Sequence, residues 1–175
     1  METKRCSKCK KVQPVSEFAK KPESKSGYSS HCKSCKREYS AKQRNTTKGI
    51  YQTIKGRVKF IKNHPEQYRR CGKVKNVLIS EKDFIDWYDH APRVCVYCDL
   101  EERNFRKIND GHINKVKRLT IDCKNNDLGY SKGNLVLACL RCNSIKADIF
   151  SFDEMRDIAQ KHIKPKWEKQ LQESS

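Results

Sequence analysis

The chain has 175 residues, of which 35% are hydrophobic and 34% are charged, with a formal net charge of +18. This length allows one domain or two small ones, and so polar a composition excludes an ordinary large hydrophobic core. Ten cysteines could instead bind metal ions that stabilise small domains with little hydrophobic core. No apolar run is long enough for a secretory leader or a membrane span, so we expect a cytoplasmic protein with reduced thiols and no membrane partner.

The positive charge is concentrated in the first half of the chain. Residues 1–76 contain 22 Lys and Arg against 5 Asp and Glu, a net charge of +17, whereas residues 77–175 contain 17 against 16, a net charge of +1. A merely solvated surface needs no such bias. The asymmetry therefore predicts a basic region that binds nucleic acid, joined to a charge-balanced module.

Residues 1–40 predict a small zinc ribbon or zinc finger. Two Cys-x-x-Cys pairs supply four thiols: Cys6, Cys9, Cys32 and Cys35. In a reduced protein such pairs favour one zinc ion over disulfides, and a closed zinc site can order a segment with little core. Val12, Val15 and Phe18 are available for that small core. The alternative interpretation is four unrelated thiols.

Residues 41–76 predict a basic helical region. Four apolar residues recur at the helical period: Ile50, Ile54, Val58 and Ile61. Four basic residues are interspersed among them and form the expected DNA-binding set: Lys55, Arg57, Lys59 and Lys62. His64-Pro65 should end the helix. The alternative is a packing helix with a solvated basic face. Cys71, which has no Cys-x-x-Cys partner, is expected to be a buried or bystander thiol.

Residues 77–165 predict a globular module, followed by a loose tail at 166–175. Capping patterns open two helices, one after Ser80 and one after Ser151, and Pro165 is expected to end the second. The aromatic residues of the first helix are interpreted as core.

Two further cysteine pairs frame a candidate chemical site: Cys95, Cys98, Cys139 and Cys142. Their spacing predicts a second structural zinc. Residues 119–122 alternate as a strand does, residues 135–138 suit a more buried strand, and a helix is expected from Cys139. This order places Asp122 at a strand end near the helix that carries Asn143. One carboxylate and one amide oxygen suit Mg²⁺ or a similar hard cation, whereas zinc prefers the sulfur sites.

These motifs resemble the HNH, or ββα-metal, nuclease family over about Cys95–Lys146. The resemblance implies a small zinc-stabilised α+β fold, in which a zinc ribbon or finger and a basic helical linker precede a ββα-metal nuclease module. It also implies that Asp122 and Asn143 are ligands of the catalytic metal and that Asn134 holds the loop without binding metal. The family's usual general base is a histidine directly after the aspartate, where this chain has Cys123.

One restriction-type branch of the family also departs at that histidine and is similar over most of the chain. It shares the N-terminal four-cysteine site and three further motifs: Phe84-Ile-Asp-Trp87-Tyr88, Gly129-Tyr130-Ser131, and Asp148-Ile-Phe-Ser151 with Glu154-Met155. In that branch a loop tyrosine activates water, which implies Tyr130 here.

The general base remains open between several residues. A neutral tyrosine, with an ordinary pKa of about 10, is a poor base at pH 7, although a divalent cation and Lys124 or Lys132 can lower that pKa. Tyr130 could instead be a packing residue, with His112 as the base. Cys123 is not expected to act as a catalytic thiolate.

The resemblance implies a bacterial or phage-encoded DNA endonuclease, which uses two structural zinc ions and a catalytic Mg²⁺ on double-stranded DNA. We expect a sequence-specific, restriction-type or phage-type homodimer. The alternatives are a monomeric nicking or homing enzyme and a non-catalytic zinc DNA-binding protein, in which Cys123 marks lost chemistry. Lys146 and Arg141 either contact a phosphate or lie on a solvated face.

Overall fold

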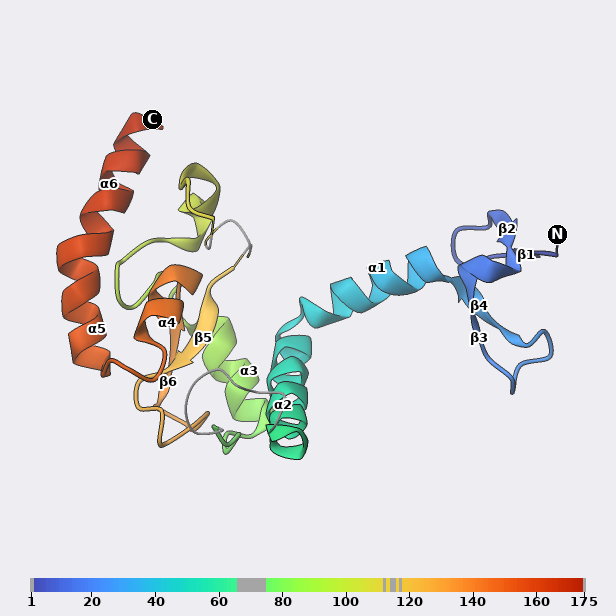
Figure 1. Cartoon of the computed structure of the whole chain (residues 1–175), viewed down its shortest axis with the longest axis horizontal. Helices are drawn as coiled ribbons and strands as arrows, with labels where there is room; N and C mark the ends of the chain where they lie inside the picture. The colour runs from blue at the N-terminus through green and yellow to red at the C-terminus, as the bar shows by residue number, and fades with distance from the viewer. Residues whose placement is uncertain (1, 66–74, 112, 114–115, 117, 175) are drawn as a thin grey trace. The chain divides into compact units, whose positions relative to one another are not determined.

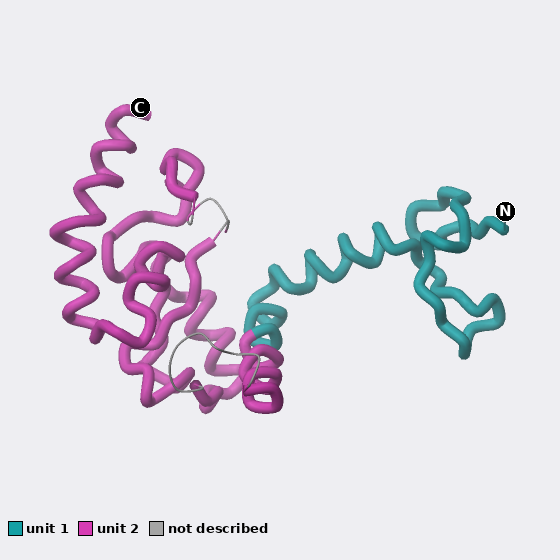
Figure 2. The backbone as a smooth tube through the Cα atoms, viewed as in Figure 1, with its two compact units in different colours: residues 1–53 teal, residues 54–175 magenta. Residues whose placement is uncertain are grey.

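A computed structural model describes residues 2–65, 75–111, 113, 116 and 118–174. Cys71 and His112 lie outside these residues, so their predicted roles stay predictions. The chain divides into two compact units, residues 1–53 and 54–175 (Figure 2). None of the helices in the described residues is long and apolar enough to cross a membrane.

Unit 1 consists of two short antiparallel hairpins followed by helices (Figure 1). In chain order its elements are β1 (Thr3–Arg5), β2 (Val12–Pro14), η1 (Val15–Glu17), β3 (Phe18–Lys20), β4 (Tyr28–Cys32) and α1 (Lys33–Arg44). Phe18 is buried with Cys6, Cys32 and Cys35. The expectation that Val12 joins this core is wrong, since its side chain is 65% exposed. The sulfur atoms and Phe18 occupy the centre of the cluster, which leaves Val12, on the three-residue strand β2, at the surface.

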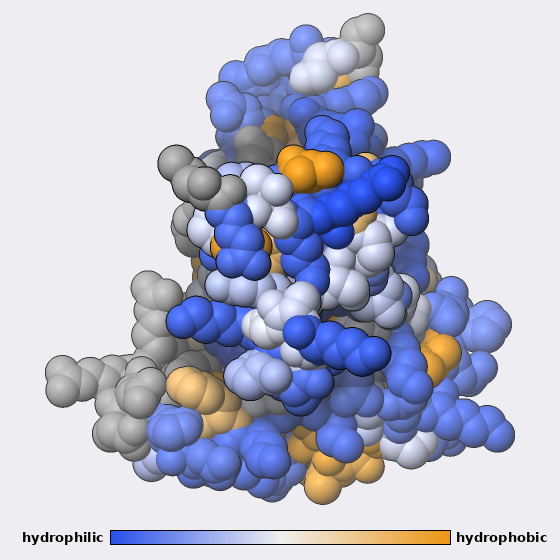
Figure 3. All heavy atoms as spheres, turned by 90° about the vertical axis from the view of Figure 1, so that its right-hand side faces the viewer, coloured by the Kyte–Doolittle hydropathy of each residue, from blue (hydrophilic) through white to orange (hydrophobic). Residues whose placement is uncertain are grey.

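Helix α2 (Thr47–Asn63) confirms the predicted amphipathic helix and its end before His64-Pro65. Ile50 and Ile61 are buried, and the four basic residues of the predicted DNA-binding set are all exposed. The helix crosses the boundary between the two units. Figure 3 shows one face of the chain, on which hydrophilic residues predominate and apolar ones form small separate groups.

Unit 2 contains the predicted hairpin and helix. Its elements after α2 are α3 (Glu81–His90), η3 (Glu102–Lys107), β5 (Thr120–Cys123), β6 (Leu135–Ala138), α4 (Leu140–Lys146), α5 (Phe152–Ile158), η5 (Ala159–Ile163) and α6 (Lys164–Glu173). Strands β5 and β6 are antiparallel, with Asp122 opposite Val136. All four residues of β6 are buried, as its apolar sequence predicts. The order β5, β6, α4 is the ββα arrangement expected from the sequence.

The two predicted helix caps are present. Ser80 accepts from the backbone N of Asp83, and Ser151 forms a full capping box with Glu154. Side chains thereby satisfy amide groups at both helix starts.

The expectation of a loose tail at 166–175 is wrong. Helix α5, the π-helical turn η5 and α6 follow one another without a break (Figure 1), and Trp167 is buried. Pro165 does not end this run because it lies in the first turn of α6, where its missing N–H and fixed φ are tolerated. The C-terminal residues therefore form part of unit 2.

Candidate metal and active site

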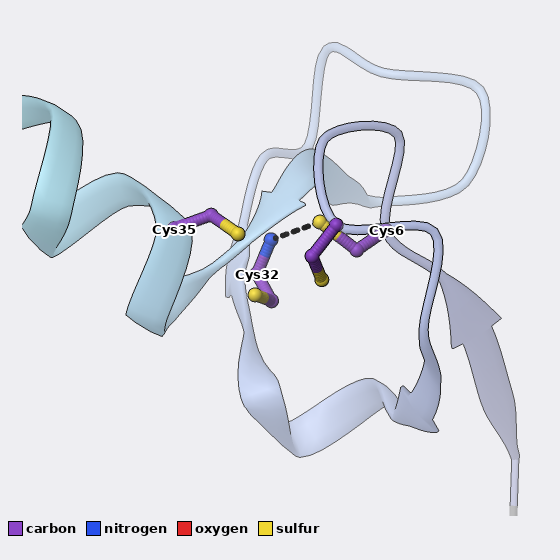
Figure 4. A group of neighbouring side chains, drawn as sticks. Cys6, Cys32 and Cys35 are labelled. Atoms are coloured by element: carbon purple, nitrogen blue, oxygen red, sulfur yellow. Dashed lines mark hydrogen bonds between the residues drawn. The ribbon is translucent and has the colours of Figure 1, made fainter.

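Each predicted cysteine set forms a compact four-sulfur cluster. In both sets the Sγ atoms all lie within 4.8 Å of one another. Figure 4 shows the first cluster, in which the backbone N of Cys32 donates to Sγ of Cys6 at 3.3 Å. This donor is the main cause that lowers the pKa of Cys6 to about 6, whereas burial raises the pKa of Cys35 to about 12. Four sulfurs this close together fit the donor set of a structural zinc.

The second cluster joins the start of α4, just after the β5–β6 hairpin, to residues 95–98, the zinc knuckle formed by the first cysteine pair. Sγ of Cys98 lies 3.8 Å from Sγ of Cys139. Cys139 also caps α4, since its sulfur accepts from the backbone N of Cys142. The C-terminal helical run also contacts the knuckle, because Gln160 in η5 donates to the carbonyl oxygen of Tyr97 at 2.7 Å. A metal at this cluster would hold the elements that carry the candidate site.

Asp122 is a buried carboxylate at the centre of the candidate site, with only 2% of its surface exposed. Its Oδ2 accepts from the hydroxyl of Tyr97 at 2.8 Å, and its Oδ1 accepts from the backbone N of Cys123 at 2.8 Å. Nζ of Lys146 lies 3.5 Å from Oδ2, and Nζ of Lys75 lies 3.6 Å from Oδ1. Burial and then the charge of Asp122 raise the pKa of Tyr97, so its hydroxyl keeps the proton that it donates.

Thr120 orients Asn143 against β5, the strand that carries Asp122. The hydroxyl of Thr120 donates to the carbonyl oxygen of Ala138 at 2.8 Å, which uses its single proton. It can therefore only accept from Asn143, whose Nδ2 lies 2.9 Å away. Nδ2 also lies 3.5 Å from the carbonyl oxygen of Ile121. With the amide nitrogen turned toward β5, the carbonyl oxygen of Asn143 is left for another ligand.

Lys146 is the second buried charge of the site, with 1% of its surface exposed. Its Nζ donates to the carbonyl oxygen of Cys123 at 3.0 Å and to Oδ1 of Asn126 at 3.4 Å. The solvated-face alternative for Lys146 is therefore wrong, and a phosphate contact would require it to leave these acceptors. The sequence missed this burial because a lysine one helical turn after Asn143 ordinarily faces solvent.

Arg141 is half-buried and makes a two-pronged contact with Asp110. Its Nε and Nη2 donate to the same carboxylate oxygen, Oδ2, at 3.0 and 2.7 Å. The guanidinium thus fixes the 110 region against α4, and any contact of Arg141 with DNA has to be shared with this pair.

Tyr130 is half-buried and fixed through its backbone to the segment before α3. Its N donates to the carbonyl oxygen of Asn76 at 2.7 Å. Gly129 has φ +56°, and a Cβ there would lie 2.5 Å from that same oxygen, so only glycine allows this close approach. Nζ of Lys75 lies 5.9 Å from the centroid of the Tyr130 ring. One ammonium group therefore lies near both Tyr130 and Asp122.

The two lysines expected near Tyr130 have contacts elsewhere. Nζ of Lys132 lies 3.7 Å from Oδ1 of Asp83, and Nζ of Lys124 lies 6.0 Å from the centroid of the Phe152 ring. Lys75 takes the place that the sequence assigned to them.

Asn134 and Cys123 are both buried. The Nδ2 of Asn134 donates to the carbonyl oxygens of Asn125 and Gly129 at 2.8 and 2.7 Å, and its Oδ1 accepts from the N of Asn125 at 2.9 Å. These contacts fasten the loop. Cys123 is fully buried, and burial is the main cause that raises its thiol pKa to about 11. A thiol that stays protonated at neutral pH is a poor base or nucleophile.

Three residues of the site escaped the sequence analysis: Tyr97, Lys75 and Thr120. Tyr97 lies inside a zinc knuckle and was overlooked between its cysteines. Lys75 belongs to a strongly basic stretch, where nothing distinguishes one lysine from the next. Thr120 was seen only as the polar member of an alternating strand.

The fold is similar to that of a solved HNH endonuclease, which confirms at the level of the fold the resemblance read from the sequence. A solved structure similar to the chain is that of PacI, a rare-cutting HNH restriction endonuclease described for its mechanism of DNA perturbation. The TM-score is 0.51 at 23% sequence identity, over 95% of this chain and 97% of PacI. No protein-family model and no curated protein sequence matches the chain.

Proposed function

We propose that the protein is a metal-dependent DNA endonuclease of the HNH type. The observation that carries the proposal is the buried carboxylate of Asp122 on β5, in a ββα unit bounded by four cysteines whose helix α4 holds Asn143 against the preceding β5 residues Thr120 and Ile121. A zinc-only DNA-binding protein has no need of these two oxygen donors. The likeness of the fold to PacI, and the +17 charge of residues 1–76, support DNA as the partner.

The metal assignments follow from donor chemistry. Each four-sulfur cluster suits one structural zinc. Asp122 and Asn143 offer the hard oxygen ligands that suit Mg²⁺, which when bound would stabilise negative charge at the scissile phosphate and the leaving 3′ oxygen. The two cation types need not compete, because sulfur and oxygen donors select between them.

The residues of the chain have separate tasks in the proposed reaction. Tyr130 accepts the proton of the attacking water, and Asn134 keeps its loop in place. Tyr97 and Thr120 orient the two metal ligands. Hydrolysis of the phosphodiester leaves a 5′ phosphate and a 3′ hydroxyl, as the HNH resemblance implies. A restriction-type or phage-type homodimer would cut both strands of the duplex.

The test is a nicking assay on supercoiled plasmid with and without Mg²⁺. Asp122→Ala and the shape-conserving Asp122→Asn should abolish nicking but leave DNA binding, since the lost carboxylate serves the metal and otherwise repels phosphate. Asp127→Asn, which removes an exposed carboxylate from the same loop, is the matched control and should cut normally. Unchanged nicking by Asp122→Asn in Mg²⁺ would show that the assigned site is wrong.

Two alternatives give other outcomes in the same assay. A monomeric nicking or homing enzyme converts the plasmid only to the open circle, whereas a homodimer also produces linear DNA. A non-catalytic zinc DNA-binding protein shifts the plasmid on a gel and cuts neither strand in any divalent cation.

A further inference from the structure

Each oxygen of Asp122 faces one hydrogen-bond donor and one ammonium group. A carboxylate offers about four positions for such partners, two on each oxygen. Oδ1 faces the backbone N of Cys123 at 2.8 Å and Nζ of Lys75 at 3.6 Å. Oδ2 faces the hydroxyl of Tyr97 at 2.8 Å and Nζ of Lys146 at 3.5 Å. A divalent cation can bind this carboxylate directly only after one of the four partners withdraws.

Three of the partners are fixed by their surroundings. The N of Cys123 belongs to the backbone of β5. Tyr97 is fully buried, and Gln160 holds its carbonyl oxygen. Lys146 is 1% exposed and donates to the carbonyl oxygen of Cys123 and to Asn126. Moving any of the three would uncover buried polar groups, which is costly.

Lys75 is the partner that can leave. Its side chain is 24% exposed, and its contact with Asp122 is the longest of the four. Its residue lies outside the helices and strands of the structure. In the same position Nζ lies 5.9 Å from the centroid of the Tyr130 ring, so the ammonium can move toward this ring as it leaves the carboxylate.

We propose that Lys75 is the exchangeable counter-ion of Asp122. Its ammonium neutralises the buried carboxylate until a divalent cation takes its place at Oδ1, while Lys146 stays as the permanent counter-ion. This inference rests on the metal site at Asp122 in the proposed function. An ammonium and a divalent cation repel each other at one carboxylate, so Lys75 lowers the affinity for metal. Once displaced, the same ammonium is available to an incoming DNA phosphate.

The inference is tested by Mn²⁺ binding in the absence of DNA, measured by electron paramagnetic resonance of the free ion. Lys75→Met should bind Mn²⁺ about tenfold or more tightly than the parent chain, because the competing charge is gone. Lys75→Arg retains the charge and should resemble the parent. Lys124→Met removes an exposed lysine from the same unit and is the matched control. Two zinc ions per chain would show that each variant is folded.

Asp122→Asn, alone and combined with Lys75→Met, separates the two proposals. If Asp122→Asn removes Mn²⁺ binding but Lys75→Met binds no more tightly than the parent, the metal site stands and the exchange is wrong. If Mn²⁺ binds equally well with and without the Asp122 carboxylate, the metal lies elsewhere and both proposals fail. Tighter binding in Lys75→Met that disappears with Asp122→Asn supports the exchange.

Discussion

The two four-cysteine clusters share a ligand set but differ in what surrounds them. The first cluster packs with little more than Phe18 and Tyr28, and Cys9 is only half-buried. The second has four buried cysteines and adjoins β6 and α4, with the fully buried Tyr97 inside its knuckle. The first cluster therefore takes the place of a core, whereas the second joins elements that also have contacts of their own.

Because their surroundings differ, loss of metal should have different consequences in the two clusters. In unit 1 the sulfur cluster and Phe18 form the hydrophobic cluster around the two hairpins, so order of these hairpins would depend on a metal bound there. In unit 2 the knuckle supplies Tyr97 to Asp122, and the start of α4 at Cys139 leads directly to Asn143. Zinc in the second cluster would thus determine the geometry of the proposed catalytic site as well as its stability.

The largest expected effects come from breaking each cluster in turn. Cys139→Ser should abolish cleavage and destabilise unit 2, because it removes a zinc ligand, whereas a serine can still cap α4. Cys32→Ser should disorder unit 1 alone and weaken DNA binding. Metal analysis and limited proteolysis would follow both variants, with one zinc expected to remain in each. Loss of protection in unit 2 on Cys32→Ser would show that the clusters are not independent.

Tyr130→Phe should retain both zinc ions and lose about 10²-fold or more in cleavage rate, the usual scale for a general base. The substitution removes only the hydroxyl, so it separates a base from a packing residue. Single-turnover cleavage at saturating DNA measures the chemical step. Adding Cys123→His to Tyr130→Phe should partly restore the cleavage rate, because it returns the usual base of the HNH family. A parental rate in Tyr130→Phe together with an inactive His112→Ala would assign the base to His112 instead.

Tyr97→Phe should slow cleavage about 10- to 100-fold, on the expectation that a buried hydrogen bond to a charged group contributes about 1.5–3 kcal/mol. The lost hydroxyl orients Oδ2 of Asp122, so Mn²⁺ affinity should fall along with the rate. In Tyr130→Phe the rate should fall without that loss of affinity. Equal Mn²⁺ binding by Tyr97→Phe and the parent would mean that the knuckle supports the site only by packing.

The ββα unit could be predicted from sequence because its signals are local. Alternation marks β5, four apolar residues mark β6, and the spacing of Cys139 and Cys142 marks the start of α4. The C-terminal helix could not be predicted in this way. A proline normally ends a helix, and only the three-dimensional fold shows that Trp167 has a buried place to occupy.

The ligands of the candidate site could be predicted, but the groups around them could not. Asp122 and Asn143 stand at motif positions, whereas Tyr97 reaches Asp122 from 25 residues away along the chain. Lys75 and Lys146 looked like surface charges, because composition does not show which lysines a fold will bury. To predict contacts between distant segments one must know the register of the β5–β6 hairpin and the path of residues 95–98. No local sequence pattern gives either.

The smallest expected effect tests the basic face of α2, where Lys59 is exposed and stands for the predicted DNA-binding set. Lys59→Gln should weaken duplex binding only a few-fold, for every DNA sequence alike, and reduce the slope of log K against log salt by about one, because one phosphate contact is lost. Cleavage at saturating DNA should not change, since the residue belongs to binding rather than chemistry.

Lys166→Gln is the matched control, because it removes an exposed lysine from the charge-balanced half of the chain. Its salt slope should equal that of the parent, because the excess charge that releases counterions lies in residues 1–76. Equal slopes in both variants would take α2 out of the DNA-binding surface. The charge of unit 1 would then be the remaining source of affinity, which Cys32→Ser already tests. Binding and chemistry would in that case divide between the two clusters rather than between a helix and a hairpin.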